Sequence, residues 1–165
     1  MAASGGGPLA GVVMGSLSDL PVMEQAGQTL SGLGIAHETR VLSAHRTPEA
    51  TLAYAREAEG RGLRVIIAGA GMAAHLAGFI ASSTLLPVIG VPLTGSPLAG
   101  ADALLSTLQM PTGVPVATVA LNGAKNAAWL AARILALSDP PLAVRLREAR
   151  EEMARAVAEA DASIP

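Results

Sequence analysis

The sequence contains no cysteine and is poor in aromatic residues, with one Trp, one Tyr and one Phe among 165 residues. Without cysteine the chain can form no disulfide, no thiol nucleophile and no thiolate-held metal or iron–sulfur centre. It also lacks an excess of basic residues, because 11 Lys and Arg are matched by 13 Asp and Glu, which leaves a net charge of -2. Phosphate-backbone binding needs such an excess, so nucleic acid is not an expected partner.

Charged residues are absent from a long stretch, residues 65–101. On paper this stretch is long enough to cross a bilayer core of ~30 Å. Glycine and proline interrupt it repeatedly, however, and divide it into pieces of strand or short-helix length. We therefore expect no membrane-spanning helix. The first seven residues lack the basic and apolar regions of a secretory signal, which makes a cytoplasmic location the expectation.

The chain has the length of a single domain, and 165 residues can bury a compact core without covalent staples. We expect a flexible N-terminus over residues 1–7, an α/β core over 8–137 and a C-terminal helical extension over 138–165. In that extension a helix is predicted over 141–162, and its apolar residues form one stripe: Leu142, Leu146, Ala149, Met153 and Val157. This helix either packs on its own subunit or packs across a subunit boundary.

Short apolar runs alternate with helical patterns along the core. Strands are predicted over 9–14, 36–42, 65–68, 88–91 and 116–120, and helices within 18–34, 48–60, 73–84, 101–109 and 124–137. Ser18 or Asp19 can cap the first helix, Thr47 is the expected N-cap of the second, and residues 69–71 are expected to turn the chain into the third. Continuous apolar strands alternating with helices predict a doubly wound α/β fold with a parallel sheet covered on both faces.

Polar or glycine-rich loops follow the first three predicted strands. They are Gly-Ser-Leu-Ser-Asp at 15–19, Ser-Ala-His-Arg at 43–46 and Gly-Ala-Gly at 69–71. Ligands of open parallel sheets bind beyond the carboxyl ends of the strands. Hydroxyls, N–H groups at a helix start and an arginine suit a phosphate monoester, so we expect a phosphorylated small molecule. Ser18 and Asp19 could equally serve as ordinary helix caps.

The three histidines differ in their surroundings. His45 precedes Arg46 in a strand-end loop, where an imidazole can give and take a proton near neutral pH, so we expect it to be the functional histidine. His37 is expected to be an exposed or edge side chain of the second strand. His75 either satisfies local backbone at a helix start or lines the floor of the site. Because these residues are dispersed and no carboxylate pair is near, we expect no metal site.

Other functions of this fold class fit the sequence poorly. A flavodoxin-type carrier usually stacks its flavin on aromatic residues, and none of the three aromatic residues falls in a strand-end loop. A phospho-receiver needs an aspartate at the end of the third strand, where this chain has Ala-Gly-Ala at 68–70. The chain also lacks the glycine-rich Lys-Ser/Thr loop of nucleoside triphosphate sites and the Gly-x-Ser-x-Gly nucleophile elbow.

Four segments together match a known pattern. They are Gly15-Ser16-Leu17-Ser18-Asp19, Ser43-Ala44-His45-Arg46-Thr47-Pro48, Ala68-Gly69-Ala70-Gly71 with Ala73-Ala74-His75-Leu76, and Gln-Met-Pro-Thr-Gly-Val-Pro-Val-Ala-Thr at 109–118. In this order, from about residue 12 to about residue 137, the chain resembles the N5-carboxyaminoimidazole ribonucleotide mutase family, which is related to aminoimidazole ribonucleotide carboxylases. It departs from the family pattern at Met72 and Ala77, where the family usually has glycine and proline.

The resemblance implies a flavodoxin-like three-layer sandwich with a five-stranded parallel sheet, assembled as a homo-octamer. It implies an isomerase that converts N5-carboxyaminoimidazole ribonucleotide to 4-carboxy-5-aminoimidazole ribonucleotide in de novo purine (IMP) biosynthesis, with no ATP, metal or cofactor. By the same resemblance Ser16, Ser43 and Arg46 hold the 5′-phosphate, with Ser18 nearby, and Asp19 takes the ribose hydroxyls. Ala70, Gly71 and Leu76 shape the base and carboxylate pocket, His75 belongs to the binding residues, and His45 is the proton carrier.

The residues themselves suit this chemistry. Moving a carboxyl group from nitrogen to carbon through free CO2 changes the proton count by zero, so one histidine that donates and then accepts suffices. Two alternatives stay open. A related animal-type enzyme carboxylates aminoimidazole ribonucleotide directly with CO2, but its loop resembles Ser-Ala-His-Lys-Gly-Pro, whereas Arg46 and Thr47 favour the mutase. The second alternative is a non-catalytic nucleotide-binding oligomer. The high apolar content favours an oligomer in either case.

Overall fold

The computed structural model describes residues 7–164, and the flexibility expected of residues 1–6 lies outside this range. The described chain contains a five-stranded sheet in the order β2-β1-β3-β4-β5, with all neighbouring strands parallel. The strands are β1 (Ala10–Met14), β2 (His37–Val41), β3 (Val65–Gly71), β4 (Val88–Leu93) and β5 (Ala117–Thr118). A 3-10 helix, η1 (Leu17–Asp19), precedes α1 (Leu20–Gly32), and the other helices are α2 (Pro48–Glu57), α3 (Leu76–Ala81), α4 (Ala101–Leu108), α5 (Ala124–Ala136) and α6 (Pro140–Ala162).

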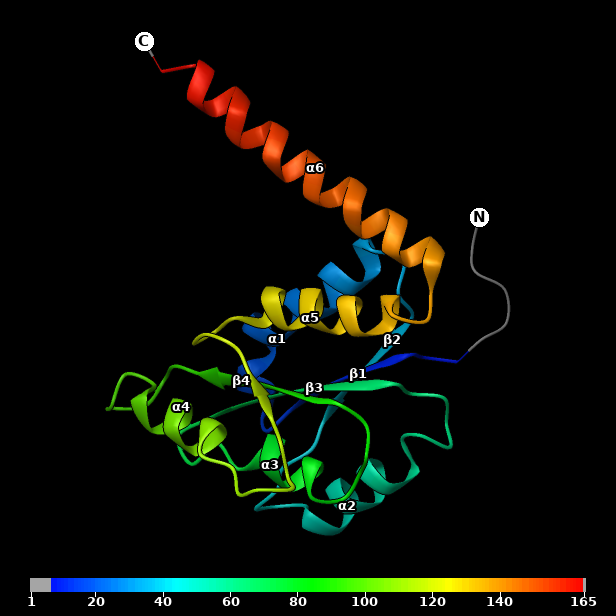
Figure 1. The fold of residues 1–165 in the computed structure, drawn as a ribbon. Coiled ribbons are helices and arrows are strands. Elements are labelled where there is room, and N and C mark those ends of the chain that lie inside the picture. The colour runs from blue at the N-terminus through cyan, green and yellow to red at the C-terminus, as the bar shows by residue number, and fades with distance from the viewer. Residues whose placement is uncertain (1–6, 165) are drawn as a thin grey trace.

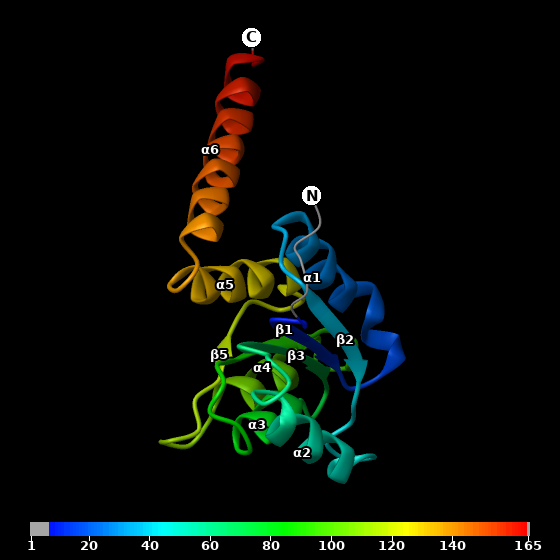
Figure 2. The ribbon, with the colours of Figure 1, turned by 90° about the vertical axis from the view of Figure 1, so that its right-hand side faces the viewer.

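Helices cover both faces of the sheet. Helices α1 and α5 lie on one face, and α2, α3 and α4 lie on the other (Figure 1, Figure 2). Successive residues of β1 alternate between the two cores, because side chains of a strand point to opposite faces. Val12 and Met14 pack with α1 and α5, whereas Val13 packs with residues of α2 and α3. The predicted doubly wound, three-layer α/β fold is therefore confirmed, and His37 lies, as expected, on an edge strand.

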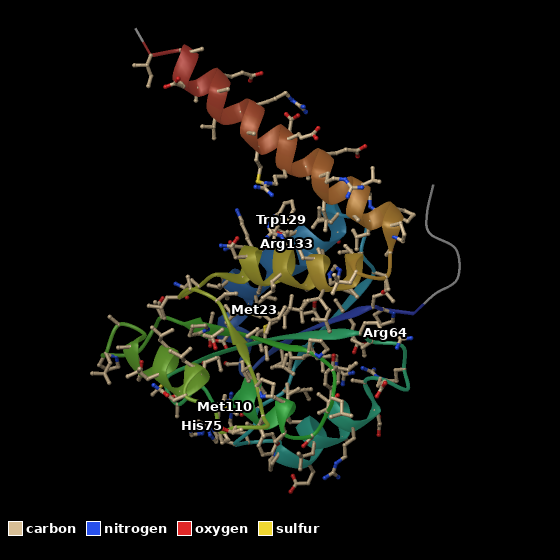
Figure 3. All side chains as sticks on the ribbon, viewed as in Figure 1. Met23, Arg64, His75, Met110, Trp129 and Arg133 are labelled. Atoms are coloured by element: carbon tan, nitrogen blue, oxygen red, sulfur yellow. The ribbon has the colours of Figure 1, made fainter. Side chains whose placement is uncertain are left out.

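The end of β3 differs from the prediction. Gly69 to Gly71 do not turn the chain but are the last residues of the strand, paired with β4 through Gly69↔Val91, Ala70↔Pro92 and Gly71↔Leu93. Small residues are needed there because a Cβ on Gly69 would lie 2.2 Å from Sδ of Met23, which lies between α1 and the sheet (Figure 3). The turn falls on residues 72–75 instead, so α3 begins at Leu76 and is half as long as predicted.

Two other boundaries are corrected by the structure, and the start of α2 lies where it was predicted. Thr47 holds the N-cap position of α2 but makes no side-chain cap; its Oγ1 accepts from the Ser43 N–H (3.0 Å) and donates to the Ser43 carbonyl (3.1 Å), which closes the loop before the helix. Helix α2 ends at Glu57 rather than near residue 60. Strand β5 has two residues rather than five, because only Ala117 and Thr118 pair with β4.

Helix α6 packs on the core through its first half alone. The Asp139 side chain caps it at the Leu142 N–H (2.9 Å), Leu142 is fully buried, and Arg145 Nε donates to the Leu33 carbonyl (3.1 Å). Farther along, Met153 and Val157 are 49% and 70% exposed, and the helix projects away from the core (Figure 1). The predicted apolar stripe is thus half covered by the chain itself.

No helix among residues 7–164 is long and apolar enough to cross a membrane.

Candidate active site

A cavity of about 650 Å³ lies beyond the carboxyl ends of β2, β1, β3 and β4. We call it the strand-end cavity. Its lining comes from the loops that follow these strands: Gly15, Ser16, Ser18, Asp19, Ser43, Ala44, His45, Arg46, Ala70, Gly71, Met72, Ala73, Leu76, Thr94 and Gly95. This is the edge at which parallel sheets bind ligands, because the winding of the helices reverses between adjacent strands there. Nine of the ten residues predicted for the site line this cavity, and His75 is the exception.

The loop after β1 is held by a capping box. Ser16 is the N-cap of η1, whereas Asp19 holds the predicted N-cap position of α1 without capping that helix through its side chain. The Ser16 N–H donates to Asp19 Oδ2 (3.0 Å), and Ser16 Oγ accepts from the N–H (3.4 Å) and the hydroxyl (2.9 Å) of Ser18. The capping interpretation of this segment is therefore correct, and the same three side chains also line the cavity. Partial burial raises the pKa of Asp19 above its ordinary value, although the Ser16 N–H and the nearby Arg46 act in the opposite direction.

Arg46 joins the loops after β2 and β1. One terminal guanidinium nitrogen donates to the Gly15 carbonyl (2.7 Å), and Nε donates to Ser43 Oγ (3.4 Å), which also accepts from the Arg46 N–H (3.2 Å). Within residues 7–164 the ion pairs are Arg61 with Glu38 and Arg155 with Glu152, so Arg46 has no carboxylate partner. Its charge, oriented by two neutral oxygens, suits an anion such as a phosphate.

The two histidines near the cavity are in contact. Nε2 of His45 lies 2.8 Å from Nδ1 of His75, and the two rings meet edge to face with centroids 4.9 Å apart. His75 precedes α3 but makes no side-chain cap, so the expectation that it satisfies local backbone is wrong. Nor does it line the cavity floor; it supports His45 from the start of α3.

The wall opposite these polar groups is made of small residues. Ala70 and Gly71 end β3, Ala73 follows, and Leu76 is buried at the start of α3. The side chains of this wall offer no hydrogen-bonding partner to water, which suits an apolar gas such as CO2. Met72 also lines the cavity, with 61% of its surface exposed, whereas Ala77 is buried in α3 and does not line it.

Sequence reasoning missed the loop after β4. Thr94 and Gly95 line the cavity, yet only the first three strand ends were expected to contribute. The rule that places ligands at strand ends applies equally to the fourth strand, so the signal was present. A second sign of this site is backbone strain. Among residues 7–164, the non-glycine residues with positive φ are Met72, Ala99 and Asn122, which follow β3, β4 and β5 at this edge.

Two further observations concern the rest of the described chain. Among residues 7–164 no three His, Asp or Glu side chains are grouped closely enough to hold a metal ion. A second hollow, of about 780 Å³, lies near the amino end of β4, where Arg56 and Glu59 are the charged residues among Ser, Thr and apolar side chains. It contains no histidine and lies at the opposite edge of the sheet, so the strand-end cavity is the candidate active site.

The chain is similar to known proteins over most of its length. A family model described as AIR carboxylase matches residues 9–156. The N5-carboxyaminoimidazole ribonucleotide mutase of Pyrococcus horikoshii is 56% identical over 152 residues, which cover 92% of this chain and 86% of that protein. The enzyme of the same name from Thermotoga maritima is 57% identical, with 92% and 89% covered. The crystal structure of Treponema denticola PurE superposes with a TM-score of 0.86 at 34% identity, over 95% of this chain and 98% of that one.

Proposed function

Since the chain belongs to the AIR carboxylase family, we propose that its strand-end cavity binds a ribonucleotide and moves a carboxyl group from nitrogen to carbon. The chain's activity is that of an N5-carboxyaminoimidazole ribonucleotide mutase, an isomerase of de novo purine biosynthesis. The observation that carries the proposed mechanism is the placement of an unpaired arginine and a histidine, Arg46 and His45, in one loop beside a wall of small apolar residues.

The phosphate is bound between the loops after β1 and β2. Arg46 donates from its guanidinium, and the hydroxyls of Ser16 and Ser43 donate from either side, with Ser18 next to Ser16. Asp19 uses one carboxylate oxygen to hold the Ser16 N–H, which leaves the other oxygen to accept from the ribose hydroxyls. The ribonucleotide then extends along the edge of the sheet toward β3, where Ala70 and Gly71 leave room for the base.

His45 carries one proton out and back. The N–C bond of the carbamate breaks, CO2 is released into the apolar part of the cavity, and the exocyclic nitrogen takes a proton from His45. The ring carbon then attacks CO2, the new C–C bond forms, and His45 removes the proton from that carbon. Atoms, charge and protons balance with no added reactant. Nε2 of His45 is engaged by His75, so the other ring nitrogen, Nδ1, faces no protein partner among the described residues and serves as the proton carrier.

A comparison of two substrates tests this function. The purified chain receives N5-carboxyaminoimidazole ribonucleotide in one assay and aminoimidazole ribonucleotide with bicarbonate in the other. The mutase mechanism predicts faster product formation from the carbamate, because CO2 is delivered inside the cavity. Faster turnover from bicarbonate would select the direct carboxylase, and tight binding of the ribonucleotide without turnover would select the non-catalytic oligomer.

The functional unit in this proposal is a homo-octamer of single-domain subunits in the cytoplasm, each subunit including both the core and α6. Support comes from apolar side chains that one subunit leaves in water. Leu85 and Leu137 are 98% and 88% exposed, and the outer half of α6 exposes Met153 and Val157. Such surface favours association between subunits. Light scattering coupled to gel filtration measures the subunit number, and a monomer at assay concentration would contradict this part.

A further inference from the structure

Thr94 is held by Asn122, a residue 28 positions later in the chain. The Thr94 N–H donates to Asn122 Oδ1 (3.0 Å), and Asn122 Nδ2 donates to Thr94 Oγ1 (2.7 Å). The Asn122 N–H in turn donates to the carbonyl of Pro92 in β4 (2.9 Å). One amide side chain therefore joins the loop after β5 to the loop after β4, at the point where that loop lines the strand-end cavity.

These contacts determine the direction of the Thr94 hydroxyl. A backbone N–H can only donate, so the atom that receives it must be the oxygen of the Asn122 amide, and the atom facing Oγ1 must be the NH2 group. Oγ1 of Thr94 is thus an acceptor toward Asn122, and its own hydrogen must point elsewhere. No hydrogen bond donated by this hydroxyl occurs among residues 7–164, although Thr94 lines the cavity. The hydroxyl is a donor without a protein acceptor.

The rest of the Thr94 side chain is also fixed. Its methyl carbon Cγ2 packs against Gly100, where an added Cβ would lie 3.1 Å away. Because a β-branched side chain has few χ1 states, a methyl group against Gly100 and an oxygen against Asn122 leave one orientation. Asn122 adopts φ 54°, a left-handed conformation that asparagine takes more readily than other non-glycine residues.

The position of Thr94 points to one part of the substrate. Arg46 and Ser16 lie in the loops of β2 and β1, and β4 is two strands beyond β1 in the sheet. Neighbouring strands are ~4.8 Å apart, so the end of β4 lies about 10 Å along the edge from the end of β1 and about 14 Å from the end of β2. A ribonucleotide anchored by its phosphate places its base, not its ribose, at these distances. The base of the proposed substrate carries a carboxylate, which is a strong acceptor for a hydroxyl donor.

We propose that Thr94 contacts the migrating carboxylate as a hydrogen-bond donor and that Asn122 is the positioning residue that orients its hydroxyl. The inference rests on the proposed function, because it takes the carboxylated ribonucleotide as the ligand. It adds a fourth strand end to the site and assigns a specificity role to a residue outside the motifs of the sequence. The Thr94 hydroxyl distinguishes carboxylated ribonucleotide from the decarboxylated form.

Two substitutions of nearly unchanged shape test the donor. Thr94→Val removes the hydroxyl and keeps the branched shape, and Thr94→Ser keeps the hydroxyl. By calorimetry with 4-carboxy-5-aminoimidazole ribonucleotide, we expect Thr94→Val to weaken binding about tenfold and Thr94→Ser to bind within about twofold of wild type. Affinity for aminoimidazole ribonucleotide, which has no carboxylate, should be the same in all three. A purely structural role of Thr94 would weaken both ligands alike and would overturn the inference.

A third variant tests the positioning role. Asn122→Asp retains an acceptor for the Thr94 N–H but cannot donate, so the Thr94 hydroxyl turns to donate to Asp and away from the cavity. We expect a loss of kcat/KM similar to that of Thr94→Val, and no further loss in the double variant, because both changes remove one hydrogen bond. Additive losses would indicate charge repulsion by Asp and contradict the positioning role.

Turnover of the carbamate by the wild type is measured alongside. An inactive wild type would refute the proposed function, whereas an active wild type with unaffected variants would refute this inference alone.

Discussion

Nε2 of His45 and Nδ1 of His75 lie 2.8 Å apart, although thirty residues separate them in the sequence. Two ring nitrogens at this distance share one proton, so one imidazole donates and the other accepts. His45 lines the strand-end cavity and His75 does not, so the contact orients the ring that lines the cavity. In the proposed mechanism His45 is the proton carrier and His75 is its support, so the two residues are expected to respond differently to substitution.

Replacement of the proton carrier should abolish the chemistry and spare binding. We expect His45→Asn to lower kcat by about 10²- to 10⁴-fold, the usual contribution of a general acid and base. The affinity for product should change little, because the phosphate contacts come from other residues. His37→Asn on the edge strand β2 is the matched control and should keep wild-type kcat. A His45→Asn variant with normal turnover would remove His45 from the mechanism.

Replacement of His75 should have a smaller effect than replacement of His45, because His75 acts through His45. His75→Leu removes the partner of Nε2, so the His45 ring loses its fixed orientation. We expect kcat to fall about tenfold with KM unchanged, as an interaction that serves the transition state requires. In the His45→Asn background the same substitution should have no further effect on kcat. Steady-state kinetics of the four proteins measure this, and independent, additive losses would show that His75 acts on its own.

Arg46 should determine affinity through the phosphate. Arg46→Lys keeps the positive charge but loses the planar guanidinium group. That group donates to the Gly15 carbonyl and to Ser43 Oγ and has further N–H groups for the phosphate. Charged hydrogen bonds contribute about 1.5–3 kcal/mol each, so we expect binding to weaken about ten- to a hundredfold. Titration with ribose 5-phosphate isolates this contact from the base. Arg64→Lys, at the amino end of β3, is the control and should leave affinity unchanged.

Asp19 should make a pH-dependent contribution to stability of a defined sign. Burial raises its pKa in the folded chain above the ordinary 3.8, so the folded state holds this proton more tightly than the unfolded state. The contribution is therefore fully present below pH 3.8 and is lost as the pH rises through the folded pKa. Asp19→Asn retains an acceptor for the Ser16 N–H and cannot titrate. Urea titrations across this pH range measure the unfolding free energy of both proteins. As the pH rises, we expect the wild type to lose stability relative to Asp19→Asn. A wild type that gains relative stability with rising pH would contradict the burial argument.

Sequence patterns predicted the local features of this structure. Sequence patterns placed β1, β2 and β4 within two residues of their observed ends, and the strand-end rule located Ser16, Ser43, His45 and Arg46 at one edge. Both depend on residues near one another in the chain. These predictions were wrong where contacts with residues distant in the sequence determine the local structure. Gly69 to Gly71 read as a turn, yet they continue β3 because β4 supplies their hydrogen-bonding partners and Met23 excludes larger side chains.

By itself the sequence determined the fold class and the family, since alternating apolar segments and short motifs define both. Only the tertiary structure decided which side chains support the site. His75 meets His45, Asn122 holds Thr94, and Arg46 reaches Gly15 across 28 to 31 positions of chain. These pairs depend on the order and register of the strands, and the free energy that brings them together comes from burying the two cores.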